Sequence, residues 1–458
     1  MKYLIKHSVL AALLLLQVSC KKNANAPTNN NNVTGPNYDQ YGTPFTNMPA
    51  VDDVVMYEVN LRAFSTTGNL QGVINRLDSI QSLGVNVVWL MPIHPIGQLN
   101  SINSPYCVKD YKAVSTEYGT LDDLRSLTTL AHSKGIAVIM DWVANHTSWD
   151  NTWISNKSWY TQDASGNIVS PPGTGWTDVA DLNYSNTDMR QAMLDAMEYW
   201  LMTANVDGFR CDYADGIPYD FWGQTITSIR SIPNRKFLFL AEGTRLDHFT
   251  AGFDVMYGWN FYSTMQSTYQ GGLASFLYVA NTNEYTNVPG GKLRLRYTTN
   301  HDESAWNSTP MVLFNGKAGA LAASVATIFM DGVPLFYTGQ EVGRVSNVPF
   351  FSNSPINWSD NPDMLGAYKQ IMAVYTTSAT ARKGTNTDYS SADVVCFEKS
   401  RDSTEVLIVV NVRNNSIAYT VPTGLQNTNW LNALTNNTMI LGTSLQLTNY
   451  QYLILKKL

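Results

Sequence analysis

Short runs of aliphatic and β-branched residues alternate with helical segments along most of the chain. We expect strands at residues 54–59, 86–90, 136–140, 206–210, 236–240, 253–256, 294–298 and 333–337. These runs show almost no alternation of apolar and polar positions, which is typical of a parallel sheet buried on both faces. Eight parallel strands separated by helices predict a closed (β/α)8 barrel, an α/β TIM barrel.

Helix signals separate several of these strands. Two apolar stripes have helical spacing: Leu124, Leu127 and Leu130, and Leu70, Ile74, Leu77 and Ile80. The first stripe follows a capping-box pattern from Thr120 to Asp123. The stripes are followed by Gly135 and Gly84, and glycine commonly ends a helix. A third helix is expected to begin within residues 185–188.

Two stretches depart from the alternation. Residues 147–181, after the third strand, have little periodicity and predict a protruding subdomain, because compact domains seldom contain connections of that length. Its tryptophans are Trp149, Trp153, Trp159 and Trp176, and they could stack on a ligand or form the segment's own small core. From residue 384 the pattern changes to alternating strands without helices. We therefore assign residues 51–383 to the barrel and 384–458 to a C-terminal antiparallel β-sandwich.

The N-terminus is predicted to be a targeting segment. Lys2 and Lys6 precede an apolar run at 9–16, which is too short for the roughly 20 residues that span a bilayer. Residues 1–20 therefore predict a secretory signal, and Cys20 at its end resembles the lipobox of bacterial lipoproteins. An ordinary cleaved signal with an incidental cysteine is the alternative, since Gln17 departs from the pattern.

Residues 21–50 are rich in Asn, Pro and Thr and predict a flexible tether. We expect export, as an outer-membrane lipoprotein at the cell surface or in the periplasm, or otherwise secretion. Any contact with a membrane would then pass through the N-terminal lipid anchor.

Composition excludes several classes of protein. The 458 residues are 44% hydrophobic and 14% charged, which suits a large folded core rather than a disordered chain. The net charge is −6 and no block of like charge occurs, which argues against nucleic-acid binding. Twelve Trp and 25 Tyr favour a neutral partner with flat apolar faces. The four cysteines are widely spaced, which argues against a disulfide framework or a zinc ribbon. We also expect the protein to be a monomer.

Polar and acidic side chains follow the C-terminal ends of the predicted strands. They are His94 after the second strand, residues 141–146 (DWVANH) after the third, 210–212 (RCD) after the fourth, 241–243 (AEG) after the fifth, 300–302 (NHD) after the seventh, and 340–341 (QE) after the eighth. These ends converge on one mouth of a parallel barrel. One such acid is more often a helix cap, but acids gathered from three strands cost stability and predict a catalytic site.

Charge alone suggests different roles for these acids. Arg210 and Asp212 are two apart on one strand, so both face the same way, and the guanidinium should lower the pKa of Asp212 and keep it an anionic nucleophile. Apolar neighbours and negative companions should raise the pKa of Glu242 toward that of a general acid. An ionised Asp302 would stabilise a developing cation. The set suits an oxocarbenium-like transition state.

The same residues carry a family resemblance. Segments 141–146, 208–212, 241–243 and 300–302 resemble, in order and strand placement, the four signature regions of the α-amylase family of glycoside hydrolases. Residues 104–106, 110–111 and 117–119 resemble that family's stretch after strand two, and 181–183 its additional region at the end of the protruding B domain. The similarity runs from about Val54 to the C-terminus.

The resemblance implies a role for each matching residue. Asp212 would be the nucleophile, Glu242 the acid/base and Asp302 the transition-state stabiliser. Around the reacting sugar it implies Arg210, His146, His301 and Tyr106, the last stacked on the ring, and we add His94 from the end of the second strand. The implied mechanism retains the α-anomer through a covalent glycosyl-enzyme, with the two reacting carboxyl groups about 5 Å apart.

The resemblance also implies a structural calcium ion between the B domain and the barrel, bound by Asn145 and Asp181. Oxygen ligands of this kind suit a hard cation. Backbone carbonyls would have to supply the remaining ligands. In the alternative interpretation the two side chains only satisfy loop amides.

The substrate is less closely defined. Residues 213–216 (YADG) follow the nucleophile, where the usual α-amylase stretch carries Lys and His that contact the sugar on the leaving side. We expect an α-glucan hydrolase acting on starch or maltooligosaccharides, with an α-1,6-glucosidase, a neopullulanase-like enzyme or a transglycosylase as alternatives within the family. A metal-dependent barrel hydrolase is disfavoured because residues 57–60 contain no His-x-His and no His-Glu-x-x-His occurs. A non-catalytic glucan-binding barrel is disfavoured because all three acids are present.

Overall fold

The computed structural model describes residues 38–458. The predicted signal and Cys20, and the tether up to residue 37, lie outside this range. Within it, every helix is too short or too polar to cross a membrane.

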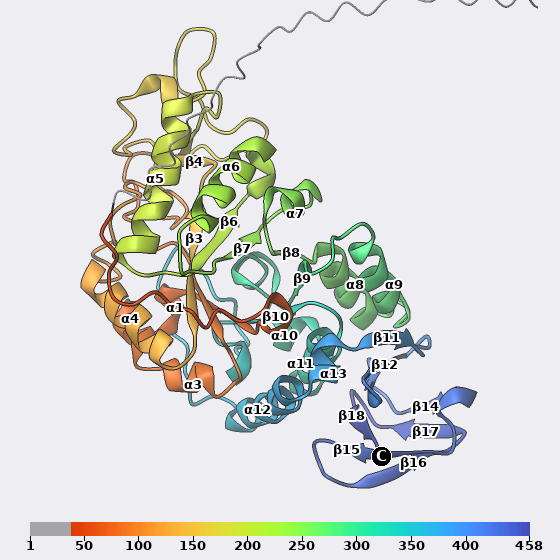
Figure 1. The fold of residues 1–458 in the computed structure, drawn as a ribbon. Coiled ribbons are helices and arrows are strands. Elements are labelled where there is room, and N and C mark those ends of the chain that lie inside the picture. Colours follow the sequence, from red (N-terminus) through yellow and green to blue (C-terminus); the bar gives the residue numbers. More distant parts are fainter. Residues whose placement is uncertain (1–37) are drawn as a thin grey trace, which may run out of the picture. The chain divides into compact units, whose positions relative to one another are not determined.

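Eight parallel strands close into a barrel in the order β1-β10-β9-β8-β7-β6-β3-β2 (Figure 1). Their bounds are β1 Met56–Val59, β2 Val87–Leu90, β3 Ala137–Val143, β6 Gly208–Asp212, β7 Leu238–Ala241, β8 Val255–Tyr257, β9 Leu293–Arg296 and β10 Val333–Tyr337. Each overlaps one of the eight predicted runs, so the predicted barrel is confirmed. Strands β3 and β6 continue past their expected ends and include the polar residues Asp141 and Asp212.

The helices lie between and around these strands. Their bounds are α1 Leu61–Phe64, α2 Leu70–Ile74, α3 Leu77–Gln81, α4 Leu121–Ser133, α5 Thr187–Thr203, α6 Tyr219–Arg230, α7 Asp247–Ala251, α8 Trp259–Tyr269, α9 Phe276–Tyr285, α10 Pro310–Leu313, α11 Lys317–Phe329, α12 Pro362–Thr377 and α13 Ala379–Lys383. The capping box before α4 is confirmed, since the side chains of Thr120 and Asp123 each accept from the other's main-chain N–H. The stripe expected as one helix at 70–80 is split into α2 and α3.

Alternate residues of the strands fill two separate apolar layers. Met56, Val87, Trp89, Ile139, Leu240 and Leu335 belong to the buried cluster inside the barrel. Their neighbours Tyr57, Val88, Val138 and Met140 belong to the larger cluster beneath the helices. Both faces of the sheet are therefore apolar over most of its length, and polar side chains concentrate at the strand ends.

The segment after β3 contains a short two-stranded antiparallel sheet. Its strands are β4 His146–Ser148 and β5 Val179–Asp181, with a 3-10 turn at Lys157–Trp159 between them. His146 pairs with Asp181 in this sheet. The sheet thus holds the base of the inserted segment beside the end of β3.

The C-terminal region forms antiparallel sheets, as predicted (Figure 1). Strands β11 Thr385–Asp388, β12 Val394–Arg401, β13 Thr404–Asn411, β18 Tyr452–Lys457, β15 Thr428–Asn432 and β16 Thr438–Leu441 form one sheet, and β14 Ile417–Thr420 and β17 Ser444–Leu447 form another. One apolar cluster includes side chains of both sheets, Trp430 and Tyr419 among them. The other face of the large sheet, with Phe397 and Ile408, belongs to the main core.

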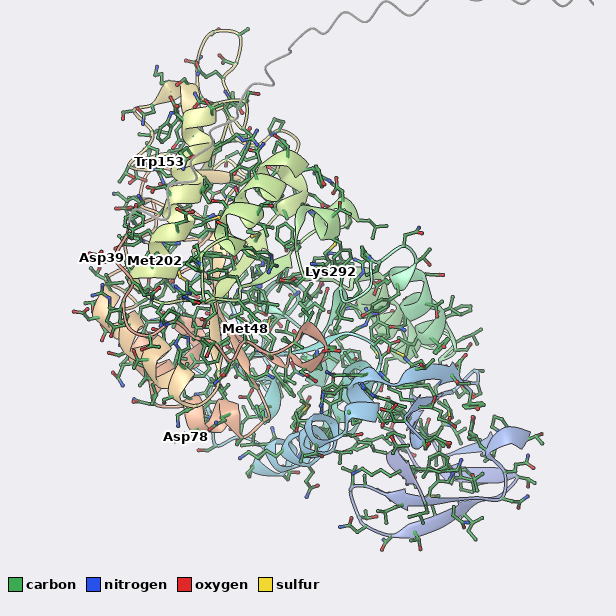
Figure 2. All side chains as sticks on the ribbon, in the orientation of Figure 1. Asp39, Met48, Asp78, Trp153, Met202 and Lys292 are labelled. Carbon is green, nitrogen blue, oxygen red and sulfur yellow. The ribbon has the colours of Figure 1, made fainter. Side chains whose placement is uncertain are left out.

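The expectation of a flexible tether reaching Ala50 is wrong for residues 38–50. The Tyr41 N–H donates to Met202 O at 2.8 Å, close to the C-terminal end of α5 (Figure 2 labels Met202). The Phe45 side chain is buried and stacks on His132 at 4.5 Å between ring centroids. The Asn- and Pro-rich composition hid these aromatic residues, whose burial stabilises the segment on the barrel.

Candidate active site

Side chains from several strand ends line a cavity of about 260 Å³. It includes the three predicted catalytic acids and three of the predicted substrate-binding residues: Asp212, Glu242, Asp302, Tyr106, His146 and His301. The acids come from the end of β6 and from the loops after β7 and β9. The predicted convergence of these strand ends at one mouth is therefore observed.

Arg210 lies beneath the cavity and is completely buried. Its Nη1 is 2.8 Å from Asp141 Oδ1 and 2.9 Å from Asp212 Oδ1. Its Nη2 is 2.9 Å from Glu242 Oε2. One guanidinium thus faces three carboxylates, and its own strand places it there, because residues 210 and 212 point to the same side of β6.

The expected low pKa of Asp212 is wrong in its net direction. Burial raises the pKa of Asp212 to about 6, and the nearby Asp141 charge adds to the rise. Arg210 lowers the pKa, as expected from the sequence, but it is shared with two other acids. The desolvation of the carboxylate therefore exceeds the attraction of its cation.

The predicted rise in the pKa of Glu242 is confirmed. Burial raises this pKa to about 7, Arg210 opposes the rise, and the charges of Asp212 and Asp302 add to it. The Tyr213 main-chain N–H donates to Glu242 Oε2 at 2.8 Å. A carboxyl group that remains partly protonated near neutral pH can act as a general acid.

His301 is held by a residue that the sequence analysis missed. Its Nδ1 is 2.5 Å from Glu58 Oε1, at the end of β1, and both side chains are buried. Burial lowers the pKa of His301, but the charges of Asp302 and Glu58 outweigh it and raise that pKa to about 9. His301 Nε2 lies 2.8 Å from the Tyr106 hydroxyl. The signal for Glu58 was an acid inside the apolar first strand.

The structure does not bring His94 to the cavity. Its ring is completely buried among the rings of Tyr111, Trp142 and Trp200, and its Nδ1 lies 3.3 Å from Ala113 O. Burial lowers the pKa of His94 to about 4, so the ring is neutral. The loop after β2 places this histidine in the core, where it fills space between aromatic side chains.

Comparison with known proteins agrees with this geometry. The family model "Alpha amylase, catalytic domain" matches residues 28–167 and 174–404. The chain belongs to the α-amylase family.

Among its α-amylase relatives, Alpha-amylase 2 of Dictyoglomus thermophilum is 24% identical over 79% of this chain and 66% of its own length. Probable oligo-1,6-glucosidase 2 of Bacillus subtilis is 32% identical over 35% of this chain and 34% of its own length. The crystal structure of an α-amylase from Lactobacillus plantarum superposes with a TM-score of 0.80 and 26% identity, over 89% of this chain and all of that one. The matched region thus spans about two thirds of the length of Alpha-amylase 2 and about one third of the length of the probable oligo-1,6-glucosidase.

Within this α-amylase barrel, the tryptophans of the inserted segment divide between the two interpretations. Trp153 packs on Tyr111 and Trp159, with ring centroids 4.7 and 5.3 Å apart, and these rings form part of a core. Trp176 lines the cavity, is 37% exposed and meets the rings of His146 and Tyr213 edge to face. Trp149 packs against the main core and donates to Thr177 O, so of the four tryptophans Trp176 alone lines the cavity.

Trp306 is a second aromatic residue of the cavity rim and was missed from the sequence. It lies four residues after Asp302, lines the cavity and is 62% exposed. Its ring contacts Phe350 and Phe351. The available signal in the sequence was a tryptophan four residues after a candidate catalytic acid.

Asn145 and Asp181 offer two oxygen ligands for the predicted calcium ion. A main-chain hydrogen bond brings the two segments together, since the Leu182 N–H donates to Asn145 O at 3.2 Å. Burial raises the pKa of Asp181, and the Thr161 side chain lowers it. Within residues 38–458 no group of three or more His, Cys, Asp or Glu side chains could hold a metal ion. Since calcium takes six to eight oxygens, these side chains do not make a complete site, and calcium remains a prediction.

Proposed function

We propose that this protein is a retaining α-glucan hydrolase that cleaves α-glucosidic bonds in starch or maltooligosaccharides. The observation that carries the proposal is the meeting of Asp212, Glu242 and Asp302 in one cavity, with the first two paired to the same buried arginine, Arg210. Family membership supports a glycosidase.

The first step uses two of the acids. The Asp212 carboxylate attacks the anomeric carbon while Glu242 gives its proton to the departing glycosidic oxygen. The products are a glycosyl ester on Asp212 and a shortened glucan. The raised pKa of Glu242 favours the proton donor, and ion pairing of Asp212 with Arg210 favours the nucleophilic anion.

The second step reverses these roles. The Glu242 carboxylate takes a proton from water, whose oxygen attacks the anomeric carbon and releases the Asp212 carboxylate. Two displacements return the sugar in its original α-configuration. Asp302, whose Oδ2 lies 3.5 Å from His301 Nε2, stands at the cavity to stabilise positive charge on the sugar ring in both transition states.

The cavity walls support a neutral sugar as substrate. Tyr106 stacks on His301 at 5.5 Å and presents the aromatic surface that we assign to the reacting ring. His146 is buried at the cavity wall, and burial lowers its pKa to about 4. A neutral histidine can accept or donate a hydrogen bond to a sugar hydroxyl. Trp176 and Trp306 supply further flat apolar surface at the rim.

An α-1,6-glucosidase is the second candidate. The 32% identity to a probable oligo-1,6-glucosidase over about a third of the chain supports it. Transglycosylation would follow the same first step with a sugar in place of water.

Proton NMR of the protein with maltoheptaose tests the proposal. We expect α-anomeric reducing ends to accumulate first, before mutarotation produces the β-anomer. Products longer than seven sugars would instead indicate a transglycosylase. Cleavage of isomaltose without cleavage of maltoheptaose would indicate an α-1,6-glucosidase. A protein silent on maltoheptaose, pullulan and isomaltose would contradict the proposal, with the Asp212→Asn variant as the inactive control.

We also propose that the protein is exported as a monomeric lipoprotein anchored through Cys20. The sequence pattern at residues 1–20 supports this proposal. Palmitate labelling of the full chain in a bacterial host tests it, because the Cys20→Ser variant should lose the label. A labelled variant would contradict the assignment.

A further inference from the structure

Two loops, one after each reacting acid, are joined by main-chain hydrogen bonds. One follows β6 and begins at Tyr213, and the other follows β7 and begins at Glu242. The Ala214 N–H donates to Glu242 O at 2.8 Å, and the Glu242 N–H donates to Cys211 O at 3.0 Å. The Tyr213 N–H donates to the Glu242 carboxylate itself. The position of the acid therefore depends on the loop after the nucleophile.

Tyr213 adopts a conformation that side-chain-bearing residues rarely adopt. Its φ and ψ are +40° and +48°, in the left-handed region. This geometry directs the N–H toward Glu242 and leaves the phenol ring 37% exposed against Trp176. A strained residue of this kind persists only where its surroundings hold it in place.

Asp215 is the side chain that holds the turn. Its Oδ2 accepts from the N–H and hydroxyl of Thr244, both at 2.8 Å. Its Oδ1 accepts from the Arg245 N–H at 3.2 Å and lies 2.7 Å from Nε2 of the completely buried His248. Three of these contacts come from the loop after β7, and the fourth comes from His248 in helix α7, which follows that loop. Burial raises the pKa of Asp215, but these donors, His248 first, hold it well below its ordinary value and keep the carboxylate ionised.

Close packing leaves this carboxylate little room to move. A Cβ on Gly243 would lie 2.5 Å from Asp215 Oδ1, so only glycine fits there without a shift. The Arg245 guanidinium also donates to the main-chain oxygens of Asp215 and Ile217, at 3.0 and 3.2 Å. Asp215 itself is not among the residues that line the cavity.

We propose that Asp215 is a positioning residue, which fixes the left-handed turn at Tyr213 so that its N–H holds Glu242 in place for proton transfer. The inference rests on the proposed function. Asp215 contacts the loop that follows Glu242 and helix α7, and it does not line the cavity, so its role in the site would be indirect.

The proposal predicts a selective loss of acid catalysis. In Asp215→Asn the Tyr213 N–H should drift from Glu242, and a misplacement of about 1 Å costs roughly 10²-fold in rate. We expect that loss in kcat on maltoheptaose, with KM unchanged. An aryl α-maltotrioside with an acidic phenol needs little protonation of its leaving group, so its formation of the glycosyl-enzyme should fall by less than about threefold.

The pH profile supplies a second readout that a loss of folding would not produce. The Tyr213 N–H stabilises the ionised form of Glu242, so its loss should move the basic limb of the kcat/KM profile to higher pH. Thr244→Val removes one donor to Asp215, and it should give a smaller change in the same direction if Asp215→Asn does not fold. Asp247→Asn is the matched control, because Asp247 begins helix α7 directly after this loop and pairs with Arg245 but not with Asp215.

The outcomes separate the two proposals. Equal losses on both substrates, or a change confined to KM, would overturn the positioning role while leaving the hydrolase standing. Wild-type protein inactive on both substrates would overturn the proposed function and this inference with it.

Discussion

The two ends of the barrel differ in how their acidic side chains are paired with cations. At the foot, before β8, Asp254 lies 2.6 Å from Arg230 and 3.1 Å from Lys292 (labelled in Figure 2). Before β10, Asp331 lies 3.0 Å from the buried Lys399 and also accepts from two asparagines. At the mouth, one arginine serves three carboxylates. Asp254 and Asp331 at the foot each have their own lysine or arginine, whereas the three acids at the mouth share one arginine.

The direction of the pKa shift follows this difference. At the foot, burial raises the pKa of Asp331, but Lys399 outweighs it, and the net shift is downward. At the mouth, burial prevails and the pKa values of Asp141, Asp212 and Glu242 all rise. Burial also raises the pKa of Asp207 at the foot, whose carboxylate is paired with His132 and accepts from the Val138 N–H but has no lysine or arginine partner within residues 38–458. We infer that Asp331, paired with its own lysine, stabilises the fold, and that the three acids around Arg210 are kept for chemistry at a cost in stability.

Substitution of an acid at the mouth should have the largest effect on kcat and should not lower the stability of the fold. We expect Asp212→Asn to lower kcat by a factor on the order of 10⁴ or more. Glu242→Gln should lower it by about 10²–10⁴. Because the folded pKa of Glu242 is raised, its ionised form opposes folding above pH 7, so Glu242→Gln should be at least as stable as wild type at pH 8. Urea unfolding at pH 8 checks this, and a clear loss of stability would contradict the comparison.

Substitution of an acid at the foot should lower the stability of the fold and leave kcat unchanged. Asp331→Asn leaves Lys399 buried without its charge partner and should lower the free energy of unfolding by about 3 kcal/mol. The kcat of the folded variant should not change, because Asp331 lies outside the catalytic cavity. Asp402→Asn, which breaks an exposed pair with Arg401, is the control and should be nearly neutral. A loss of kcat without a loss of stability would refute the separation of the two ends.

The pH profile of the wild type sharpens the contrast. In the proposed mechanism, Asp212 must be ionised, above a pKa of about 6, and Glu242 must be protonated, below a pKa of about 7. We expect a narrow bell for kcat/KM with its maximum between these values and a fall of about tenfold for each further pH unit. Asp331→Asn should keep both limbs. An optimum above pH 8 would show that other groups control the reaction.

The inserted segment allows a smaller test on its two kinds of tryptophan. Trp176→Ala should raise KM for maltoheptaose about fivefold, since an aromatic contact contributes roughly 1 kcal/mol. Trp153→Ala should leave KM unchanged and lower stability, because its ring packs on Tyr111 and Trp159. Kinetics paired with thermal unfolding separate the two results. The assignment fails if Trp176→Ala changes only the stability.

Calcium should give the smallest effect. If Asn145 and Asp181 help bind the ion, EGTA should lower the Tm by about 2 °C or more, and added calcium should restore it. Asp181→Asn should remove the response. An unchanged Tm in EGTA would contradict the calcium prediction and would not affect the catalytic proposal.

The barrel and the three acids could be predicted because local patterns determine them. Strands buried on both faces are recognisable as apolar runs, and the acids that we propose as catalytic interrupt those runs at the strand ends. The position of His94, the role of Glu58 and the net shift at Asp212 depend on neighbours distant in sequence. Nothing near His94 indicates that Trp200 packs on it, and nothing near Glu58 indicates His301. Burial strength, which decides the pKa of Asp212, is likewise a property of the assembled barrel.

Closure of the barrel pairs its first strand with its last, with Met56 beside Leu335. A nascent chain therefore carries β1 with one unpaired edge until almost all of the barrel has been synthesised. Contacts of such long sequence separation form slowly. The bond between Glu58 and His301 also joins the first strand to a late loop. Enzymatic activity should thus be among the last properties to return on refolding, after the helical signal has recovered.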